Sequence, residues 1–254
     1  MKAVVCRRYG SVDCEEAAMP ACGDDQLLIR VRAASINARD AFLVKGSPPI
    51  VRLIAGLRRP RNPRVVGTDA AGVVESIGRN VTRFKVGDEV FGLCRGAVAE
   101  YACMAESAAA AKPANVSFEQ AAAIPVAGLT ALQSIRDKAQ VREGESVLVN
   151  GAAGGVGSFA VQIAKSFGAN VTGVCNARNV DLVRAYADRV IDYTRDDFTK
   201  LGERWDVVID CYSTRTWLAA YKRVLKPGGR YLIIGGAANA VFGLLFRFVQ
   251  TLFL

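Results

Sequence analysis

The chain has 254 residues, 51% of them hydrophobic, and a formal net charge of +9. This length and apolar content suit a packed core and exclude a disordered tail. The sequence contains no histidine, which excludes a Ser-His-Asp triad, a histidine proton relay and the commonest kind of metal ligand.

Arginine is concentrated in one short stretch. The cluster consists of Arg52, Arg58, Arg59, Arg61 and Arg64. Such clusters attract phosphate, but a proline-containing stretch with no interleaved aromatic residue is typical of a solvated basic loop. We therefore do not expect nucleic acid as a partner. An anionic partner, including a cofactor phosphate, stays open.

Seven cysteines are scattered along the chain without a CxxC pair. An odd number without paired spacing predicts neither a disulfide framework nor a zinc ribbon. The first residues, MKAVVCRRYG, are typical of a strand followed by charges and lack the continuous apolar core of a signal peptide. We therefore expect a cytoplasmic protein.

Residues 1–124 contain short alternating or β-branched runs separated by glycine turns. Strands are predicted over 27–32, 71–77 and 89–91, and the Gly87-Asp88 pair predicts a turn into the last of these. This half is expected to be an antiparallel, barrel-like β domain with few helices.

In residues 125–254 predicted strands alternate with predicted helices. The strands cover 146–149, 171–174, 189–191, 206–209 and 230–234, and the helices cover 128–138, 156–167, 180–187 and 215–225. Strand 146–149 is nearly all apolar, as expected where both faces of a sheet are covered, and helix 156–167 has one apolar face. The alternation predicts a doubly wound α/β domain with a parallel sheet.

The final segment, 240–254, is strongly apolar but includes Arg247 and Gln250. A helix needs roughly 20 residues to cross a bilayer, so we expect a packed helix and no membrane span, with membrane contact as the alternative.

A glycine-rich string, GAAGGVG at 151–157, follows one predicted strand and opens a predicted helix. That context is what the dinucleotide fingerprint requires. Glycines let the backbone approach a pyrophosphate, and the helix N-terminus stabilises its charge. Gly154, Gly155 and Val156 are expected nearest the phosphates, and Gly157 is expected to allow close packing of the helix. An ordinary tight turn is the alternative.

The end of the next strand indicates which nicotinamide cofactor binds. An acidic residue there would bond the ribose 2′-hydroxyl of NAD, but this strand ends in Cys175-Asn176-Ala177-Arg178. Arg178 can pair with a 2′-phosphate, with Asn176 beside it, although a solvated arginine at a helix start is the alternative. The sequence therefore favours NADPH.

Seven segments in their order along the chain make it similar to a known family. They are SINARD at 35–40, VGTDAAGVV at 66–74, VGDEVFG at 86–92, AGLTA at 127–131, GAAGGVG at 151–157, VIDY at 190–193 and LKPGG at 225–229. The chain resembles the zinc-independent quinone oxidoreductase branch of the medium-chain dehydrogenase/reductase superfamily. The resemblance implies a GroES-like β-barrel domain over 1–124 and a Rossmann dinucleotide-binding domain over 125–254.

Zinc-dependent members of that family carry a cysteine where this chain has Asn37 and a histidine where it has Thr68. The four-cysteine structural zinc lobe is missing as well. The resemblance therefore agrees with the absence of histidine, and we expect no metal site.

The resemblance also implies roles for individual residues. Asn37 and Asp40 match positions near the nicotinamide and substrate, where Asn37 can polarise a carbonyl as a neutral donor; a helix cap and a structural ion pair are their respective alternatives. Further cofactor contacts are implied for Thr130, Tyr193, Gly235 and Gly236. A hydroxyl bonded within its own helix is the alternative for Thr130, and a plain core aromatic is the alternative for Tyr193.

Members of this family run further than position 254, and the resemblance implies that strands from that part close the first domain. We therefore expect an unpaired sheet edge, exposed apolar surface and self-association as a homo-oligomer. The expected function is NADPH-dependent, zinc-independent hydride transfer to a quinone, enone or similar electron-poor carbonyl compound. The alternative is a non-catalytic or truncated NADPH-binding module whose basic surface holds RNA or a protein partner.

Overall fold

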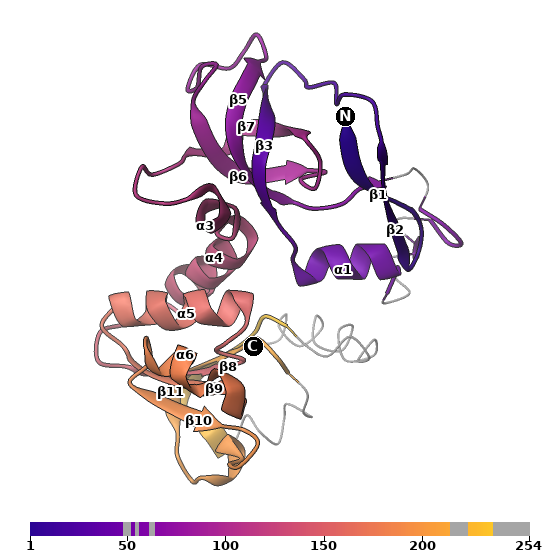
Figure 1. Ribbon diagram of the computed structural model, residues 1–254. Helices are drawn as coiled ribbons and strands as arrows, with labels where there is room; N and C mark the ends of the chain where they lie inside the picture. The colour runs from indigo at the N-terminus through magenta and orange to yellow at the C-terminus, as the bar shows by residue number, and fades with distance from the viewer. Residues whose placement is uncertain (48–51, 54–55, 61–63, 214–222, 236–254) are drawn as a thin grey trace. The chain divides into compact units, whose positions relative to one another are not determined.

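The computed structural model describes residues 1–47, 52–53, 56–60, 64–213 and 223–235 (Figure 1). The chain divides into two compact units, Met1–Val126 and Ala127–Leu254. Each unit is described by itself.

The first unit is built mainly from antiparallel strands. Its elements are β1 (Lys2–Arg8), β2 (Ser11–Glu16), β3 (Gln26–Ser35), α1 (Ala38–Lys45), β4 (Arg64–Val65), β5 (Asp69–Ile77), β6 (Glu89–Arg95), β7 (Tyr101–Ala111) and α3 (Phe118–Ala122). Strands β3, β5, β6 and β7 form a closed barrel, and β2, β1 and β4 form a separate three-stranded sheet. The barrel-like β domain predicted from the sequence is therefore confirmed.

Alternation along the strands supplies the barrel interior. Leu27 and Ile29 on β3 are fully buried, as are Val90 on β6 and Met104 on β7. These side chains belong to one apolar cluster inside the barrel. Because successive side chains of a strand point to opposite faces, one half of each strand packs inward while the other faces outward.

The expectation that this domain needs further strands for closure is wrong for the barrel. Strand β7 pairs antiparallel with β3, from Gln26 opposite Ala105 to Arg30 opposite Tyr101, so the first and last barrel strands join directly. Outer strands remain in the three-stranded sheet, where β2 and β4 each pair with β1 and with no other strand that the structure describes.

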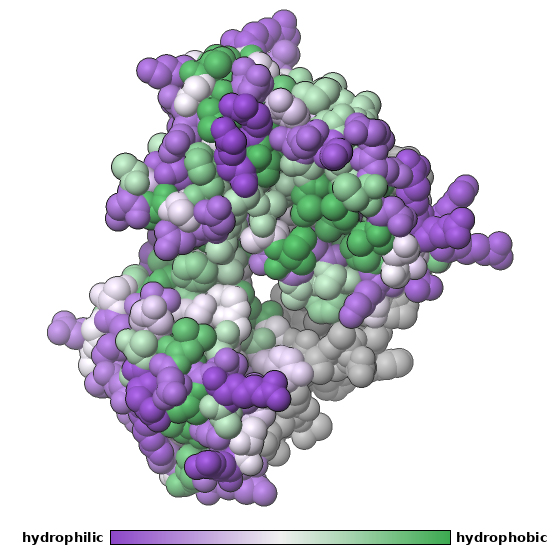
Figure 2. Space-filling view, in the orientation of Figure 1, coloured by the Kyte–Doolittle hydropathy of each residue, from purple (hydrophilic) through white to green (hydrophobic). Residues whose placement is uncertain are grey.

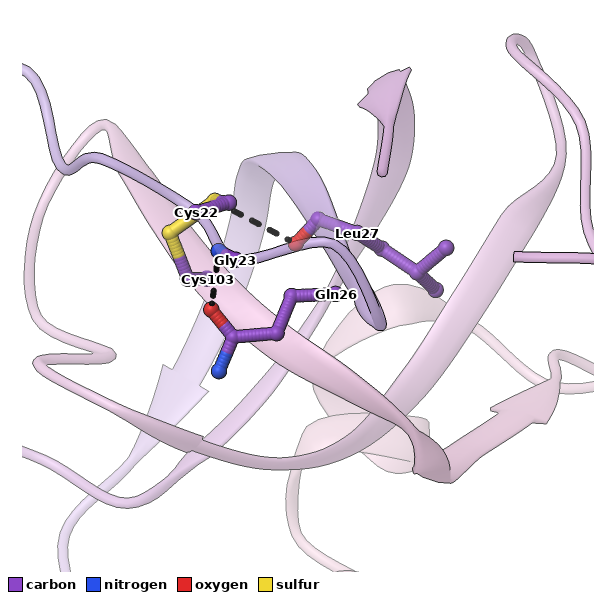
Figure 3. Close-up of a disulfide and its surroundings, with 5 residues drawn as sticks. All are labelled: Cys22, Gly23, Gln26, Leu27 and Cys103. Atoms are coloured by element: carbon purple, nitrogen blue, oxygen red, sulfur yellow. Dashed lines mark hydrogen bonds between the residues drawn. A yellow bond between two sulfur atoms is a disulfide. The ribbon is translucent and has the colours of Figure 1, made fainter. Parts of the chain in front are cut away.

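A disulfide joins Cys22 to Cys103, with the two Cα atoms 5.4 Å apart (Figure 3). An odd number of cysteines without paired spacing predicted no disulfide framework, and this bond corrects that prediction. Cysteine spacing reveals only local pairs, whereas these two residues are 81 positions apart. Barrel pairing sets Leu28 opposite Cys103, which brings the loop before β3 alongside β7.

The second unit is a parallel α/β layer structure. Its elements are α4 (Pro125–Leu132), which begins at the end of the first unit, a π-helix (Gln133–Lys138), β8 (Ser146–Asn150), α5 (Gly155–Ser166), β9 (Asn170–Cys175), a 3-10 turn (Ala177–Asn179), α6 (Val180–Arg184), β10 (Arg189–Asp192), a second 3-10 turn (Phe198–Lys200), β11 (Trp205–Asp210) and β12 (Leu225–Ile233). The strand order is β10-β9-β8-β11-β12, and all pairs are parallel. The predicted doubly wound domain is confirmed.

Helix α5 shows why this sheet forms. Ala160, Val161 and Ala164 lie on one face and are buried against the apolar strands β8 and β9. A helix that buries a stripe of small and branched side chains packs closely on a parallel sheet.

Two predicted helices differ from the structure, and a third cannot be compared over most of its length. The run 128–138 is α-helical only to Leu132 and continues as a π-helix, and the helix predicted over 180–187 ends at Arg184. Most of the helix predicted over 215–225 and the whole apolar segment 240–254 lie outside the described residues.

Polar and apolar side chains are interspersed on the visible face of each unit (Figure 2). Among the residues that the structure describes, no helix is both long enough and apolar enough to cross a membrane.

Candidate functional site

The glycine-rich loop connects β8 to α5. Gly151 has a φ of +79°, a conformation that favours glycine. Gly154 is the extended N-cap of α5, and its N–H donates to the Gly151 carbonyl over 3.0 Å. A Cβ at Gly157 would overlap the Gly151 carbonyl oxygen. The first turn of α5 is thus packed directly on the loop, and the free N–H groups of a helix start form an anion site.

This loop lies at the place where the strand order reverses. Strands β9 and β10 extend the sheet on one side of β8, and β11 and β12 extend it on the other. Ligands of open parallel sheets bind at the carboxyl ends of the strands at such a point.

A polar network that the sequence did not reveal links three neighbouring strands near their carboxyl ends. The Asn150 amide donates to Asp210 Oδ1 over 2.8 Å and to the Tyr212 carbonyl over 3.1 Å. The Tyr231 hydroxyl donates to Asp210 Oδ2 over 2.6 Å. Asp210 is 3% exposed, so these bonds hold β8, β11 and β12 in register beside the loop. The available signal was a polar final residue in otherwise apolar strands.

The carboxyl end of β9 is followed by the residues that were expected to determine whether NADPH or NADH binds. Asn176 Oδ1 is buried and accepts no hydrogen bond from the described residues. Arg178 is exposed in the 3-10 turn Ala177–Asn179, and the structure gives it no hydrogen bond or ion pair with a described residue. Buried polar atoms are nearly always hydrogen-bonded, so the Asn176 oxygen is a candidate acceptor for a ligand.

Tyr193 follows β10, and its N–H donates to the Cys175 carbonyl over 3.0 Å. The residue is 54% exposed, which argues against the alternative of a plain core aromatic. Tyr193 and the end of β9 therefore lie side by side at one edge of the sheet.

Two further expected cofactor residues are described. Gly235 follows β12, and a Cβ there would overlap the Cys211 carbonyl oxygen, so only glycine permits this approach. Thr130 is half-buried on α4, and its backbone carbonyl accepts a hydrogen bond from Ser134 Oγ over 2.7 Å. Gly236 lies outside the described residues.

The expected catalytic residues lie together in the first unit. Asn37 is the N-cap of α1, and its N–H donates to Asp40 Oδ2 over 2.8 Å. Asp40 is 2% exposed, and its other oxygen is 3.5 Å from Thr68 Oγ1. In this arrangement Asp40 caps the helix, and the structure gives it no ion pair with a described residue.

The Asn37 side chain is hydrogen-bonded to a buried carboxyl, Asp69. Asn37 Nδ2 donates to Asp69 Oδ2 over 3.0 Å and lies 3.4 Å from Ser35 Oγ. Burial raises the pKa of Asp69, while its hydrogen bonds lower it and the neighbouring Asp40 raises it further. Burial, together with the charge of Asp69, also raises the pKa of Cys94 to about 12, so this thiol stays protonated at neutral pH.

No cluster of three or more metal-ligating side chains occurs among the described residues. The hydroxyl of Thr68, where the resemblance led us to expect no metal ligand, faces Asp40.

Comparison with known proteins agrees with this fold and site. Residues 23–114 match the alcohol dehydrogenase GroES-like domain, and residues 155–251 match the family described as zinc-binding dehydrogenase. A chloroplastic quinone-oxidoreductase homolog of Spinacia oleracea is 37% identical over 85% of this chain and 68% of its own length. A chloroplastic NADPH-dependent alkenal/one oxidoreductase of Arabidopsis thaliana is 35% identical over 99% of this chain and 66% of its own.

A solved structure is similar as well. A mycobacterial protein crystallised with NADPH superposes with a TM-score of 0.81 at 28% identity, covering 93% of this chain and 74% of that one. The barrel, the doubly wound sheet and these matches together define a two-domain nicotinamide-dependent oxidoreductase. The chain belongs to the quinone oxidoreductase-like group of the medium-chain dehydrogenase/reductase family. It spans about two thirds of the length of the curated relatives named above.

Proposed function

We propose that the chain binds NADPH and transfers a hydride to a quinone, an enone or a similar electron-poor carbonyl compound, without zinc. The observation that carries the proposal is the glycine loop that caps α5 where the strand order reverses. The relatives named for quinone and alkenal/one reduction support the acceptor class.

The residues present fit a dinucleotide. The N–H groups at Gly155 and Val156, behind the Gly154 cap, would hold the pyrophosphate. Asn176 Oδ1, buried and without a partner among the described residues, would accept a ribose hydroxyl. Arg178 would pair with the 2′-phosphate, because the end of β9 carries no acid that would repel it.

When bound, the dihydronicotinamide supplies the hydride, and the protein contributes position and polarisation. We assign Tyr193 to the adenosine end of the cofactor, and Thr130, Gly235 and Gly236 to its nicotinamide end. Asn37 is the residue proposed to meet the acceptor, and Asp40, which is 2% exposed and caps α1, would act by holding Asn37 in place. With no histidine in the chain, this orientation relies on an amide and a helix-capping carboxylate.

The first test measures the affinity of the chain for each cofactor. Calorimetric titration should give tighter binding of NADPH than of NADH, and Arg178→Ala should remove most of that preference, roughly 10- to 150-fold for one charge-assisted contact. Arg184→Ala is a matched control, because Arg184 is an exposed arginine that pairs with Asp181. Equal affinities for the two cofactors in the unmodified chain would overturn the choice of NADPH.

Loss of absorbance at the NADPH band with a panel of quinones and enones tests the reaction itself. The second candidate is a cofactor-binding module that uses its basic surface for RNA or a protein partner, which the net charge of +9 favours. NADPH binding without turnover of any acceptor, combined with salt-sensitive RNA binding, would select this candidate.

We also propose a homo-oligomer and, as expected from the first residues of the chain, a cytoplasmic location. The Cys22–Cys103 disulfide is an observation against that location, because such bonds are rare in the reducing cytoplasm. Fractionation with the disulfide trapped by alkylation would decide the location.

A further inference from the structure

Asp69, the first residue of β5, is 0% exposed. A buried carboxyl is costly unless donors surround it. Its Oδ2 accepts from Ser35 Oγ over 3.3 Å, from Asn37 Nδ2 over 3.0 Å and from the Val126 N–H over 3.0 Å. These donors come from the end of β3, the cap of α1 and the first turn of α4, so one oxygen atom ties three elements together.

The second oxygen of this carboxyl has a different environment. Asp69 Oδ1 is buried and has no hydrogen-bond partner among the described residues. A proton taken up by this carboxyl would therefore sit on Oδ1, because Oδ2 is already surrounded by donors. Oδ2 then remains an acceptor in both protonation states.

This constraint fixes the Asn37 amide. Nitrogen and oxygen of an amide are distinguished by their hydrogen-bond partners, and an atom that always accepts must face Nδ2. One N–H of the Asn37 amide is thus directed at Asp69, and the second N–H, on the nitrogen that lies 3.4 Å from Ser35 Oγ, is the donor left for an acceptor.

We propose that Asp69 is a positioning residue that fixes the orientation of the Asn37 amide in the acceptor site. The inference rests on the proposed reductase function, in which Asn37 meets the acceptor. Asp69 is fully buried and acts on a ligand only through Asn37. Its role is that of a hydrogen-bond acceptor, and neither its charge nor its proton takes part in the reaction.

This role predicts how two substitutions of Asp69 rank by their effect on kcat. In Asp69→Asn, the amide oxygen can take the place of Oδ2, and the NH2 group falls where Oδ1 has no partner. Asp69→Leu is similar in size but removes the acceptor. We expect kcat of Asp69→Leu to fall roughly 10- to 100-fold through misorientation, with KM for NADPH unchanged. Asp69→Asn should recover most of that loss.

A double-mutant cycle tests whether the effect passes through Asn37. In an Asn37→Ala background, Asp69→Leu should lower kcat no further, since the group it orients is already gone. Ser35→Ala serves as a comparison: it removes the longer bond to Oδ2 and the 3.4 Å contact with Asn37 Nδ2 but leaves the Asp69 acceptor in place, so it should have a smaller effect than Asp69→Leu. An Asp69→Asn variant as inactive as Asp69→Leu would overturn the proposal, as would a full loss in the Asn37→Ala background.

A readout independent of turnover separates this inference from the proposed function. In the ¹⁵N-labelled full chain, the side-chain NH2 signal of Asn37 should exchange slowly with solvent, keep that protection in Asp69→Asn and lose it in Asp69→Leu. If the chain reduces no acceptor, the proposed function fails, and this signal still decides whether Asp69 orients Asn37. Should Asp69→Leu not fold, fast exchange of the Asn37 amide in Asp69→Asn or in the unmodified chain would overturn the inference.

Discussion

The Cys22–Cys103 disulfide should stabilise the first unit and leave the second unchanged. The bond closes a loop of 81 positions that includes β3, β5, β6 and the start of β7. Chain-entropy arithmetic gives about 4.5 kcal/mol at 25 °C for a loop of this length. Imperfect native geometry and residual structure in the unfolded chain reduce such values, so we expect roughly 2–4 kcal/mol.

The sequence offers a way to follow the two units separately. Both tryptophans, Trp205 and Trp217, belong to residues 127–254. Tryptophan fluorescence therefore reports on the second unit, and far-ultraviolet circular dichroism reports on both. In urea, Cys22→Ser should shift only the part of the dichroism transition that has no fluorescence counterpart. Cys14→Ser is the control, since Cys14 is free and exposed.

Thiol counting gives an independent check of the same bond. Five cysteines are free, so the denatured, unreduced chain should react with five equivalents of a thiol reagent, and the reduced chain with seven. Seven equivalents before reduction, or a Cys22→Ser transition that coincides with that of the unmodified chain, would refute the reasoning.

Three further predictions concern charge, metal and association. Burial alone would raise the pKa of Asp206, but hydrogen bonds from Lys226 and Ser146 outweigh it and lower the pKa to about 2. A carboxyl whose pKa is lowered by folding stabilises the protein at pH values above its unfolded-state pKa, and this stabilisation is lost as the pH falls. Asp206→Asn should therefore cost roughly 1–2 kcal/mol of unfolding free energy at pH 7 and about half of that at pH 3. Urea midpoints that differ equally at both pH values would contradict this. Dialysis against a chelator should leave NADPH binding unchanged, and stoichiometric zinc in metal analysis of the purified chain would exclude zinc independence. Sedimentation over a concentration series should detect self-association, because β2 and β4 are outer strands; a monomer at high micromolar concentration would argue against it.

The second unit could be predicted from the sequence almost element by element. Strand 146–149 and helix 156–167 correspond to β8 and α5 because an apolar run and a single apolar face are local signals that the parallel sheet reinforces. The helix over 128–138 was less accurate, since the change to a π-helix after Leu132 depends on how its side chains pack and not on their spacing.

The candidate site could be predicted only in part. Glycines 151–157 and the missing acid after β9 are local signals, and they were visible in the sequence. Asp69 was not singled out, because its importance comes from bonds to residues 34, 32 and 57 positions away. Cys22 and Cys103 were missed for the same reason, since only the pairing of β3 with β7 brings them together.

Because the barrel is closed by the pairing of β3 with β7, it can close during translation only after β7 has been made. Residues 26 and 101 open these two partner strands, and at 5–20 residues per second the ribosome needs about 4–15 s to make the chain between them. Until β7 is made, the one barrel partner that β3 can gain is β5, which is itself made late in that interval, so one edge of β3 stays unsatisfied. Antiparallel pairing over such a separation is itself slow, so the nascent first unit exposes this strand edge to association until β7 has emerged.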